Sequence, residues 1–220
     1  MLDLYQEAER WEELLDLTRE ARGRGWWRAY GVGDNSFVSF EAEAVHEREY
    51  TVDFVPGLLQ TADYSRALFV ASAVRRSADQ LAGDVAVRMI RQHRLTSTTT
   101  PIALDAVINE DVLHRPVGGS EVLREQLGRL TEAAELDSVQ LRVLPRTVGA
   151  HVAMGSGLVV LNFGDLGEPD VAYIEHALGS LLVEKEREVE RAKLSFERLR
   201  SDALSPELSL ALIRRTADQI

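Results

Sequence analysis

The pattern of hydrophobic and polar positions predicts that the chain begins with a helix. Leu4, Ala8, Trp11 and Leu15 recur at helical spacing with acidic residues between them. Residues 3–22 are therefore predicted to form an amphipathic helix, and two glycines after it mark its end. One side of this helix is apolar and needs a surface to pack against.

The segment 37–50, FVSFEAEAVHEREY, is compatible with a strand at its start and with a helix. We favour a helix, because Phe40, Ala44 and Val45 are spaced to suit one. Four glutamates would be carried by this helix: Glu41, Glu43, Glu47 and Glu49.

Capping residues mark the start of the next two helices. Thr61 is placed to cap a helix whose apolar side includes Tyr64 and Leu68. Ser77 and Gln80 have the spacing of a capping box, which predicts that a second helix starts there. The first half of the chain is therefore predicted to be mostly helical.

Short apolar runs predict strands from residue 102 onwards. They are IALDAVI (102–108), SVQLRVLP (138–145), GLVVLNF (157–163), DVAYIEH (170–176) and SLLVEK (180–185). Between the first two runs, the glycines Gly118 and Gly119 permit a turn, and Ser120 is placed to cap a helix. Near the C-terminus, Ser205 followed by Pro206 predicts another helix start.

Together these patterns predict an α+β fold. We expect a small mixed or antiparallel sheet of four or five strands in the second half, flanked by helices. The first half and the C-terminus are expected to be helical. The length of 220 residues suits one main domain with a single core.

Composition narrows the chemistry that the chain can perform. The chain has no cysteine, which excludes disulfides, thiolate zinc sites and a cysteine nucleophile. Its five histidines do not show the spacing of metal ligands, so we predict neither a metal site nor a cofactor. No apolar run reaches the roughly 20 residues of a membrane helix, so we expect a cytoplasmic protein without contact to a membrane.

The net charge bears on DNA binding. The chain has 25 Lys and Arg against 36 Asp and Glu, a formal charge of −11. Such a charge repels the phosphate backbone, and the arginines are scattered among acidic residues without forming a basic stripe. We therefore predict that the chain on its own binds DNA poorly.

The most enzyme-like stretch is YIEHALGSLLVEKE. Glu175 adjoins His176, and Glu184 and Glu186 form a Glu-x-Glu pair that could serve as a base in ADP-ribosyl transfer. The alternative is that these carboxylates lie on the exposed start of a helix, where they favour the positive end of its dipole. We favour the second interpretation and predict no catalytic residues and no enzyme.

A corner at residues 53–67, DFVPGLLQTADYSRA, offers the best candidate for binding. Its apolar residues are Val55, Pro56, Leu58 and Leu59, and its polar residues are Gln60, Thr61 and Tyr64. The corner is either a buried turn or a surface with an apolar floor and convergent polar groups, as in ligand pockets and peptide grooves. The two interpretations do not exclude each other, and these seven residues are our predicted partner- or ligand-binding site.

An ordered series of motifs carries a resemblance to a known family. From about Trp11 to the end, VPGLLQTADYSRAL, RMIRQHRL, INEDVLHRPVGG, VQLRVLP, GAHVAMG and VAYIEHALGSLLVE occur in sequence. In this series the chain resembles the C-terminal domain, catalogued as of unknown function, of actinobacterial XRE-type helix-turn-helix regulators, the WhiJ-like proteins.

The resemblance implies a cytoplasmic transcription regulator. Residues 1–30 would be a connecting helix and loop, and residues 31–220 a sensor and interaction domain. The family's helix-turn-helix domain would precede this region and is absent from the chain, so DNA would be contacted only through that domain. The implied partner is a small BldB-like companion protein or a small-molecule effector, and a homodimer is expected.

Two functional hypotheses follow. The leading one is an effector-sensing and protein-interaction domain of a transcription regulator. The alternative is a transferase of the ADP-ribosyltransferase type that uses Glu184 and Glu186. An enzyme needs these carboxylates in a concave pocket, whereas a binding module can leave them on an open surface.

Overall fold

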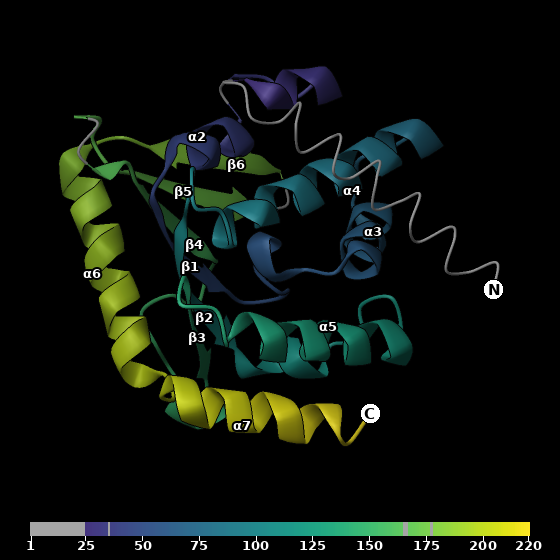
Figure 1. Ribbon diagram of the computed structural model, residues 1–220. Helices are drawn as coiled ribbons and strands as arrows, with labels where there is room; N and C mark the ends of the chain where they lie inside the picture. Colours follow the sequence, from purple (N-terminus) through teal and green to yellow (C-terminus); the bar gives the residue numbers. More distant parts are fainter. Residues whose placement is uncertain (1–24, 35, 165–166, 177) are drawn as a thin grey trace.

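The computed structural model describes residues 25–34, 36–164, 167–176 and 178–220. The helix predicted at 3–22 lies outside these residues. Within them the fold is α+β, as predicted, and contains six α-helices and a mixed sheet of six strands (Figure 1). No helix in this part of the chain is long and apolar enough to cross a membrane.

The sheet joins a parallel half to an antiparallel half, in the order β3-β2-β1-β4-β5-β6. Its strands are β1 (His46–Thr51), β2 (Ala103–Asn109), β3 (Val139–Leu144), β4 (Leu158–Asn162), β5 (Val171–His176) and β6 (Gly179–Val183). β1, β2 and β3 run parallel, whereas β4 is antiparallel to β1 and continues into the antiparallel pairs β4–β5 and β5–β6. β1 therefore lies at the junction of the two halves.

Helices cover both faces of the sheet. They are α2 (Phe37–Glu43), α3 (Ala62–Ala71), α4 (Ala78–Gln92), α5 (Ser120–Ala133), α6 (Glu186–Asp202) and α7 (Pro206–Ala217). The crossovers between the parallel strands contain α3, α4 and α5, which lie on one side of the sheet, and α6 lies on the other (Figure 1). α7 packs against α5 and β3.

Two hydrophobic clusters hold these layers together. The larger lies between the sheet and α3, α5 and α7, and includes Leu59, Ile108 and Leu127. The smaller lies between the sheet and α6, and includes Tyr50 and Phe196, both fully buried. Burying such side chains contributes about 1.5–3 kcal/mol each, so both faces of the sheet contribute to stability.

The predicted helix starts are confirmed with one exception. Thr61 Oγ1 accepts from the Tyr64 amide, Ser77 and Gln80 form a capping box, and Ser205 caps α7. Ser120 does not cap α5, because Gly119 takes the cap position with a φ of 101°. Side chains are disfavoured at that backbone angle, so glycine holds the position and Ser120 becomes the first helical residue.

The segment 37–50 departs from the prediction. The helix α2 ends at Glu43, and the chain then extends into β1, which the hydrophobic pattern had placed in a helix. The reason is pairing on both sides: β1 is hydrogen-bonded to β2 and to β4, and such tertiary context outweighs local propensity. The sheet therefore has six strands: the five that the apolar runs predict, and β1.

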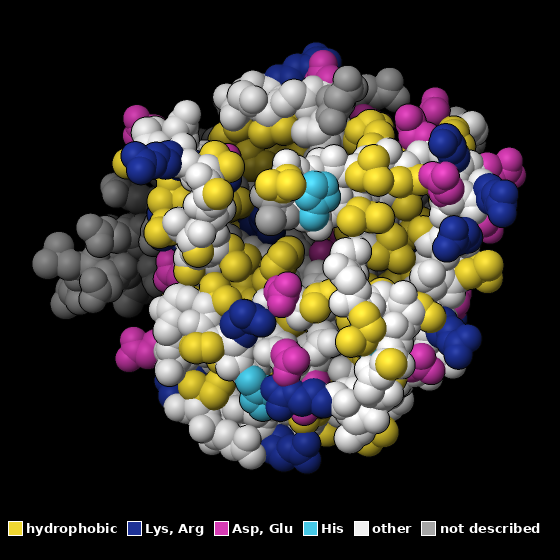
Figure 2. Space-filling model, turned by 180° about the vertical axis from the view of Figure 1, so that it is seen from behind, with side chains coloured by type: hydrophobic (Ala, Val, Ile, Leu, Met, Phe, Trp, Pro, Cys, Tyr) yellow, Lys and Arg dark blue, Asp and Glu magenta, His cyan; other side chains and the backbone are white. Residues whose placement is uncertain are grey.

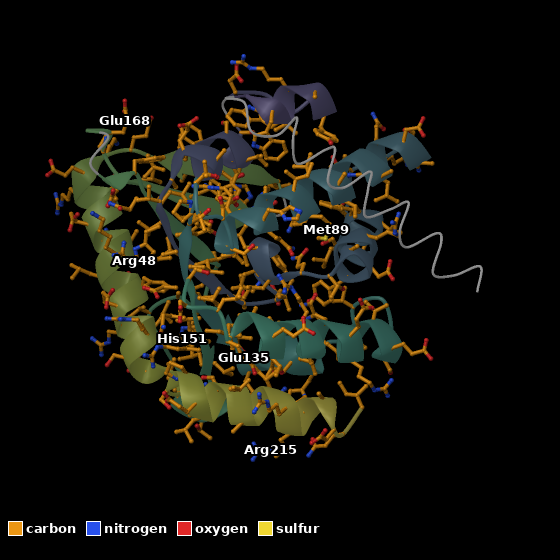
Figure 3. All side chains as sticks on the ribbon, in the orientation of Figure 1. Arg48, Met89, Glu135, His151, Glu168 and Arg215 are labelled. Atoms are coloured by element: carbon orange, nitrogen blue, oxygen red, sulfur yellow. The ribbon has the colours of Figure 1, made fainter. Side chains whose placement is uncertain are left out.

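Alternation along β1 sends its side chains to opposite faces of the sheet. Arg48 points toward α6, where its Nε lies 4.0 Å from an Oε atom of Glu197; in Figure 3, Arg48 lies on the α6 side and Met89 of α4 on the other. Because side chains alternate with a period of two, Glu47, Glu49 and Thr51 point toward α4. A row of three polar side chains therefore lies on the inner face of a central strand.

Candidate functional site

The corner at 53–67 is part of the interior. Of the seven predicted binding residues, six are buried and Thr61 is half-buried. Tyr64 Oη accepts a hydrogen bond from the Val55 amide at 3.3 Å, and Gln60 Nε2 donates to the Val55 carbonyl at 2.6 Å. The polar groups that packing alone left unexplained therefore satisfy the backbone of the turn itself.

This placement agrees with the buried-turn interpretation of the corner. A short 3₁₀ helix at Gly57–Leu59 turns the apolar side chains inward, where Leu58 and Leu59 are fully buried. A buried polar group is stable only when it has a hydrogen-bond partner, and Gln60 and Tyr64 have found theirs within the turn. The buried-turn interpretation accounts for all seven residues: Val55, Pro56, Leu58, Leu59, Gln60, Thr61 and Tyr64.

Beside this turn lies a cavity of about 410 Å³. It is lined by Phe37, Glu47, Glu49, Tyr50, Thr51, Val52, Asp53, Phe54, Gly57, Arg88, Arg91, Met154, Gly155, Ser156, Gly157, Leu158, Val159, Tyr173, Glu175 and His176. Its volume falls in the range of pockets that hold small molecules. From behind, hydrophobic side chains are seen to gather around a hollow in the surface (Figure 2).

The floor of the cavity is the inner face of three strands. Glu49 of β1 lies opposite Val159 of β4, and Val159 lies opposite Tyr173 of β5. Glu47 and Thr51 flank Glu49 on the same face of β1, because side chains two residues apart point to the same side. A polar strand thus adjoins two strands that contribute apolar and aromatic groups.

The wall opposite the sheet is formed by α2 and α4. Arg91 of α4 forms a buried ion pair with Glu41 of α2, and its Nε lies 2.9 and 3.0 Å from the two carboxylate oxygens. The Arg91 guanidinium also lies 5.3 Å from the centre of the Phe37 ring, which in turn lies 4.8 Å from the Tyr173 ring. These contacts fix the wall against the floor.

Arg88 links the cavity to the buried turn. Its Nη1 donates to Gln60 Oε1 at 3.1 Å, and its guanidinium lies 5.0 Å from the Phe69 ring. Gln60 accepts a second bond at the same oxygen from Ser65. The predicted site residue Gln60 therefore positions an arginine that lines the cavity.

Two glycines permit close approaches around the cavity. A Cβ atom at Gly57 would lie 3.0 Å from Nη1 of Arg88 and 3.3 Å from Nη2 of Arg91. A Cβ atom at Gly157 would lie 2.9 Å from the backbone oxygen of Tyr50. At both positions a side chain would occupy space that the present packing uses.

Burial raises the pKa values of the two carboxyl groups in the cavity floor. Glu47 is 1% exposed and Glu49 8% exposed. Burial raises the pKa of Glu47 well above its usual range, and the charges of Glu41 and Glu49 raise it further. Burial also raises the pKa of Glu49 to about 7. The interaction between the two carboxyl groups raises the pKa of Glu47 and lowers that of Glu49, so this pair holds a proton more tightly than an isolated glutamate does.

The pKa of Arg88, which forms no ion pair with a described residue, is shifted in the opposite direction. Burial, followed by the positive charge of Arg91, lowers the pKa of Arg88 to about 10. Both effects disfavour the charged form of a base. Arg88 nevertheless stays protonated at neutral pH and contributes a positive charge to the cavity wall.

Two buried oxygen atoms in the cavity floor lack donors. No N–H or hydroxyl group of the described residues donates to Oε2 of Glu47, and Oγ1 of Thr51 has no hydrogen-bond partner among them. Thr51 is only 4% exposed. Leaving a buried polar group unsatisfied costs about 1–3 kcal/mol, so these atoms mark a place where a ligand would gain hydrogen bonds.

The structure divides the enzyme-like stretch into two parts. Glu175 and His176 line the cavity, as does Ser156 of the MGSG sequence. Glu184 and Glu186 are exposed near the start of α6 and are not among the residues that line it. Among the described residues, no cluster of histidines and carboxylates could hold a metal ion.

Sequence reasoning missed the residues that define this site. Glu47 and Glu49 were placed on a helix, and Arg88 and Arg91 appeared only as scattered basic residues. The available signal was the sequence HEREYT, in which the acidic residues Glu47 and Glu49 alternate with basic or aromatic residues. That alternation indicates a strand, and charge on a strand that is paired on both sides marks a functional position.

Fold and site together define an α+β domain with a cavity beside the central strand of its sheet, whose floor carries buried polar side chains. The chain belongs to the family described as a domain of unknown function (DUF5753), whose model matches residues 35–215. No curated protein and no solved structure gives a significant match.

Proposed function

We propose that this domain binds a small organic molecule in the cavity and acts as the effector-sensing and interaction domain of a transcription regulator. The observation that carries the proposal is the polar inner face of β1. Glu47, Glu49 and Thr51 are buried in the cavity floor, and two of them present oxygen atoms without donors.

Stability alone does not account for this arrangement. Placing carboxyl groups on the inner face of a central strand removes them from water, which is unfavourable unless partners compensate for it. Aliphatic side chains at the same positions would extend the hydrophobic cluster that already contains Leu104, Ala106 and Leu161 on the neighbouring strands. Local departures of this kind are expected at functional sites.

The regulatory context rests on the resemblance to the C-terminal domains of WhiJ-like regulators. A net charge of −11 suits a module that acts through a partner and leaves DNA contact to another domain. In this proposal the ligand changes how the domain engages a small BldB-like companion protein or a second copy of itself, within the cytoplasm. DNA is then contacted only by a helix-turn-helix domain outside this chain.

The alternative, an ADP-ribosyl transferase, draws no support from the geometry. Glu184 and Glu186 are exposed beside the start of α6, where carboxylates interact favourably with the helix dipole. They do not line the cavity, and a transferase that uses them would need a concave site around them.

A thermal-denaturation screen against a library of small metabolites tests the proposed function. A compound that binds only the folded state raises the melting temperature, and at 1,000 times its Kd it contributes about 4 kcal/mol. Val159→Trp fills the cavity from its floor and should abolish the shift, whereas Leu194→Trp, at an exposed position on α6, should leave it unchanged. The proposal fails if no compound stabilises the wild type, or if Val159→Trp responds like the wild type.

A further inference from the structure

We infer that the ligand of this cavity is an organic cation, a primary amine or a guanidine, whose charge is received by the carboxyl groups of Glu47 and Glu49 with Thr51 as an additional acceptor. The inference rests on the proposed function, since it assigns a ligand class to the same cavity. Its basis is the charge balance of the wall, the placement of unsatisfied acceptors and the aromatic lining.

The charged groups of the cavity are out of balance in favour of acids. Four carboxyl groups line it, against the guanidinium groups of Arg88 and Arg91. Asp53 is paired with Arg115 outside the cavity. The carboxyl groups of Glu47, Glu49 and Glu175 form no ion pair with a described residue. Arg91 is already paired with Glu41, which lies behind the wall. Arg88 bonds to the neutral Gln60 and forms no ion pair with a described residue.

Glu47 and Glu49 lie two residues apart on the same face of β1, where two negative charges would repel each other unless a proton or a cation offsets them. In the free domain a proton offsets this repulsion, because burial raises the pKa of both carboxyl groups. An ammonium or guanidinium group would replace the proton and supply several N–H donors. Buried carboxylates accept such charge-assisted hydrogen bonds strongly, and Oγ1 of Thr51 supplies a further acceptor.

The remaining lining suits the organic part of such a ligand. Phe37, Phe54 and Tyr173 line the cavity together with Val159. Aromatic faces attract cations and also cover apolar surface. A cation with an aromatic or aliphatic body therefore finds complementary surfaces at both of its ends.

Binding of this kind displaces a proton and so depends on pH. The carboxyl pair interacts with Glu41 from α2, with Arg88 and Arg91 from α4, and with Arg94 beyond the end of α4, whereas Glu175 from β5 acts on Arg88. The cation competes with the proton on this pair, so affinity should rise as the pH is raised from 5 to 8.

Three probes of the same size and different charge test the inference by isothermal titration calorimetry: tryptamine, tryptophol and indole-3-acetate. Tryptamine should bind at least tenfold more tightly than tryptophol at pH 8, with indole-3-acetate weakest, and at pH 6 its binding should release a proton. Glu49→Gln should lower tryptamine affinity at least tenfold. Its matched control is Glu184→Gln, at an exposed glutamate outside the cavity, which should bind as the wild type does.

Folding and binding are separable in these variants. Glutamine resembles the protonated form of glutamate, so Glu49→Gln should melt at the same or a higher temperature while losing tryptamine. Glu47→Gln tests the same point should Glu49→Gln not fold.

The outcomes also separate this inference from the proposed function. Equal affinity for tryptamine and tryptophol overturns recognition by charge. A preference for indole-3-acetate that Arg88→Gln abolishes overturns the ligand class while supporting the cavity as a binding site. Binding by none of the three probes overturns the inference of a cation site, and the metabolite screen then decides on the proposed function.

Discussion

At the scale of single residues, the polar groups of this domain fall into two kinds. Those of the turn at Val55–Thr61 are matched internally: the hydroxyl of Tyr64 and the amide of Gln60 both bond to Val55. The polar groups on the inner face of β1 are not fully matched by described residues: the buried hydroxyl of Thr51 has no hydrogen-bond partner among them. Only the second kind gains from a ligand, which is why we place the binding site there.

The role of Tyr64 gives the first prediction. Tyr64→Phe removes the acceptor of the buried Val55 amide, and leaving that donor unsatisfied should lower the free energy of unfolding by about 1–3 kcal/mol. Leu59→Ala opens a cavity at a fully buried position and should lower it by about 2–5 kcal/mol. Urea denaturation measures both. A folded Tyr64→Phe that keeps its stability but binds its partner or ligand less well would contradict the structural role.

The pKa of Glu49 gives the second prediction. A carboxyl group whose pKa is higher in the folded chain, here about 7 against an ordinary value of 4.5, binds more protons when folded. Its contribution to stability is therefore fully present below about pH 4.5 and is lost as pH rises to about 7. The loss is on the order of 3 kcal/mol, and Glu47 adds to it in the same direction. Glu49→Gln should flatten this part of the stability profile, and a wild-type profile that rises between pH 5 and 7 would contradict the assignment.

At the scale of elements, most of the fold followed from the sequence. Short apolar runs located β2 to β6, and side-chain caps located α3, α4 and α7. β1 escaped prediction because its inner face is polar: Glu47, Glu49 and Thr51 break the hydrophobic alternation by which buried strands are recognised. The binding cavity escaped for the same reason. Burial of a charged side chain comes from pairing with strands that are distant in sequence, and local patterns do not report it.

The junction of β1 and β4 gives the third prediction. A Cβ atom at Gly157 would lie 2.9 Å from the Tyr50 carbonyl, whereas one at Gly155 would have no neighbour within 4 Å. Gly157→Ala should force the start of β4 away from β1 and lower the free energy of unfolding by about 1–3 kcal/mol. Gly155→Ala is the matched control in the same loop and should unfold like the wild type. Equal stability of the two variants would show that the strands do not approach this closely.

At the scale of the whole molecule, the sheet separates two tasks. The face covered by α6 is closed by a hydrophobic cluster that includes Val160 and Phe196. The other face carries the cavity, between β1, β4 and β5 and the helices α2 and α4. A ligand held there would contact elements from both halves of the sheet. In the proposed function, binding is therefore able to change the stability and the surface of the domain as one unit.

Charge gives the last prediction at this scale. On the face shown in Figure 2, lysine and arginine side chains are interspersed with acidic ones, and the chain as a whole has a net charge of −11. DNA binding draws on several basic side chains that contact phosphates and release counterions, and the described residues on this face do not gather them in a stripe. Fluorescence anisotropy with duplex DNA at physiological salt should therefore detect no sub-micromolar binding by the isolated chain. Sequence-specific binding at such concentrations would mean that the domain reads DNA itself, and the proposal that it acts through a partner or a separate DNA-binding domain would have to be abandoned.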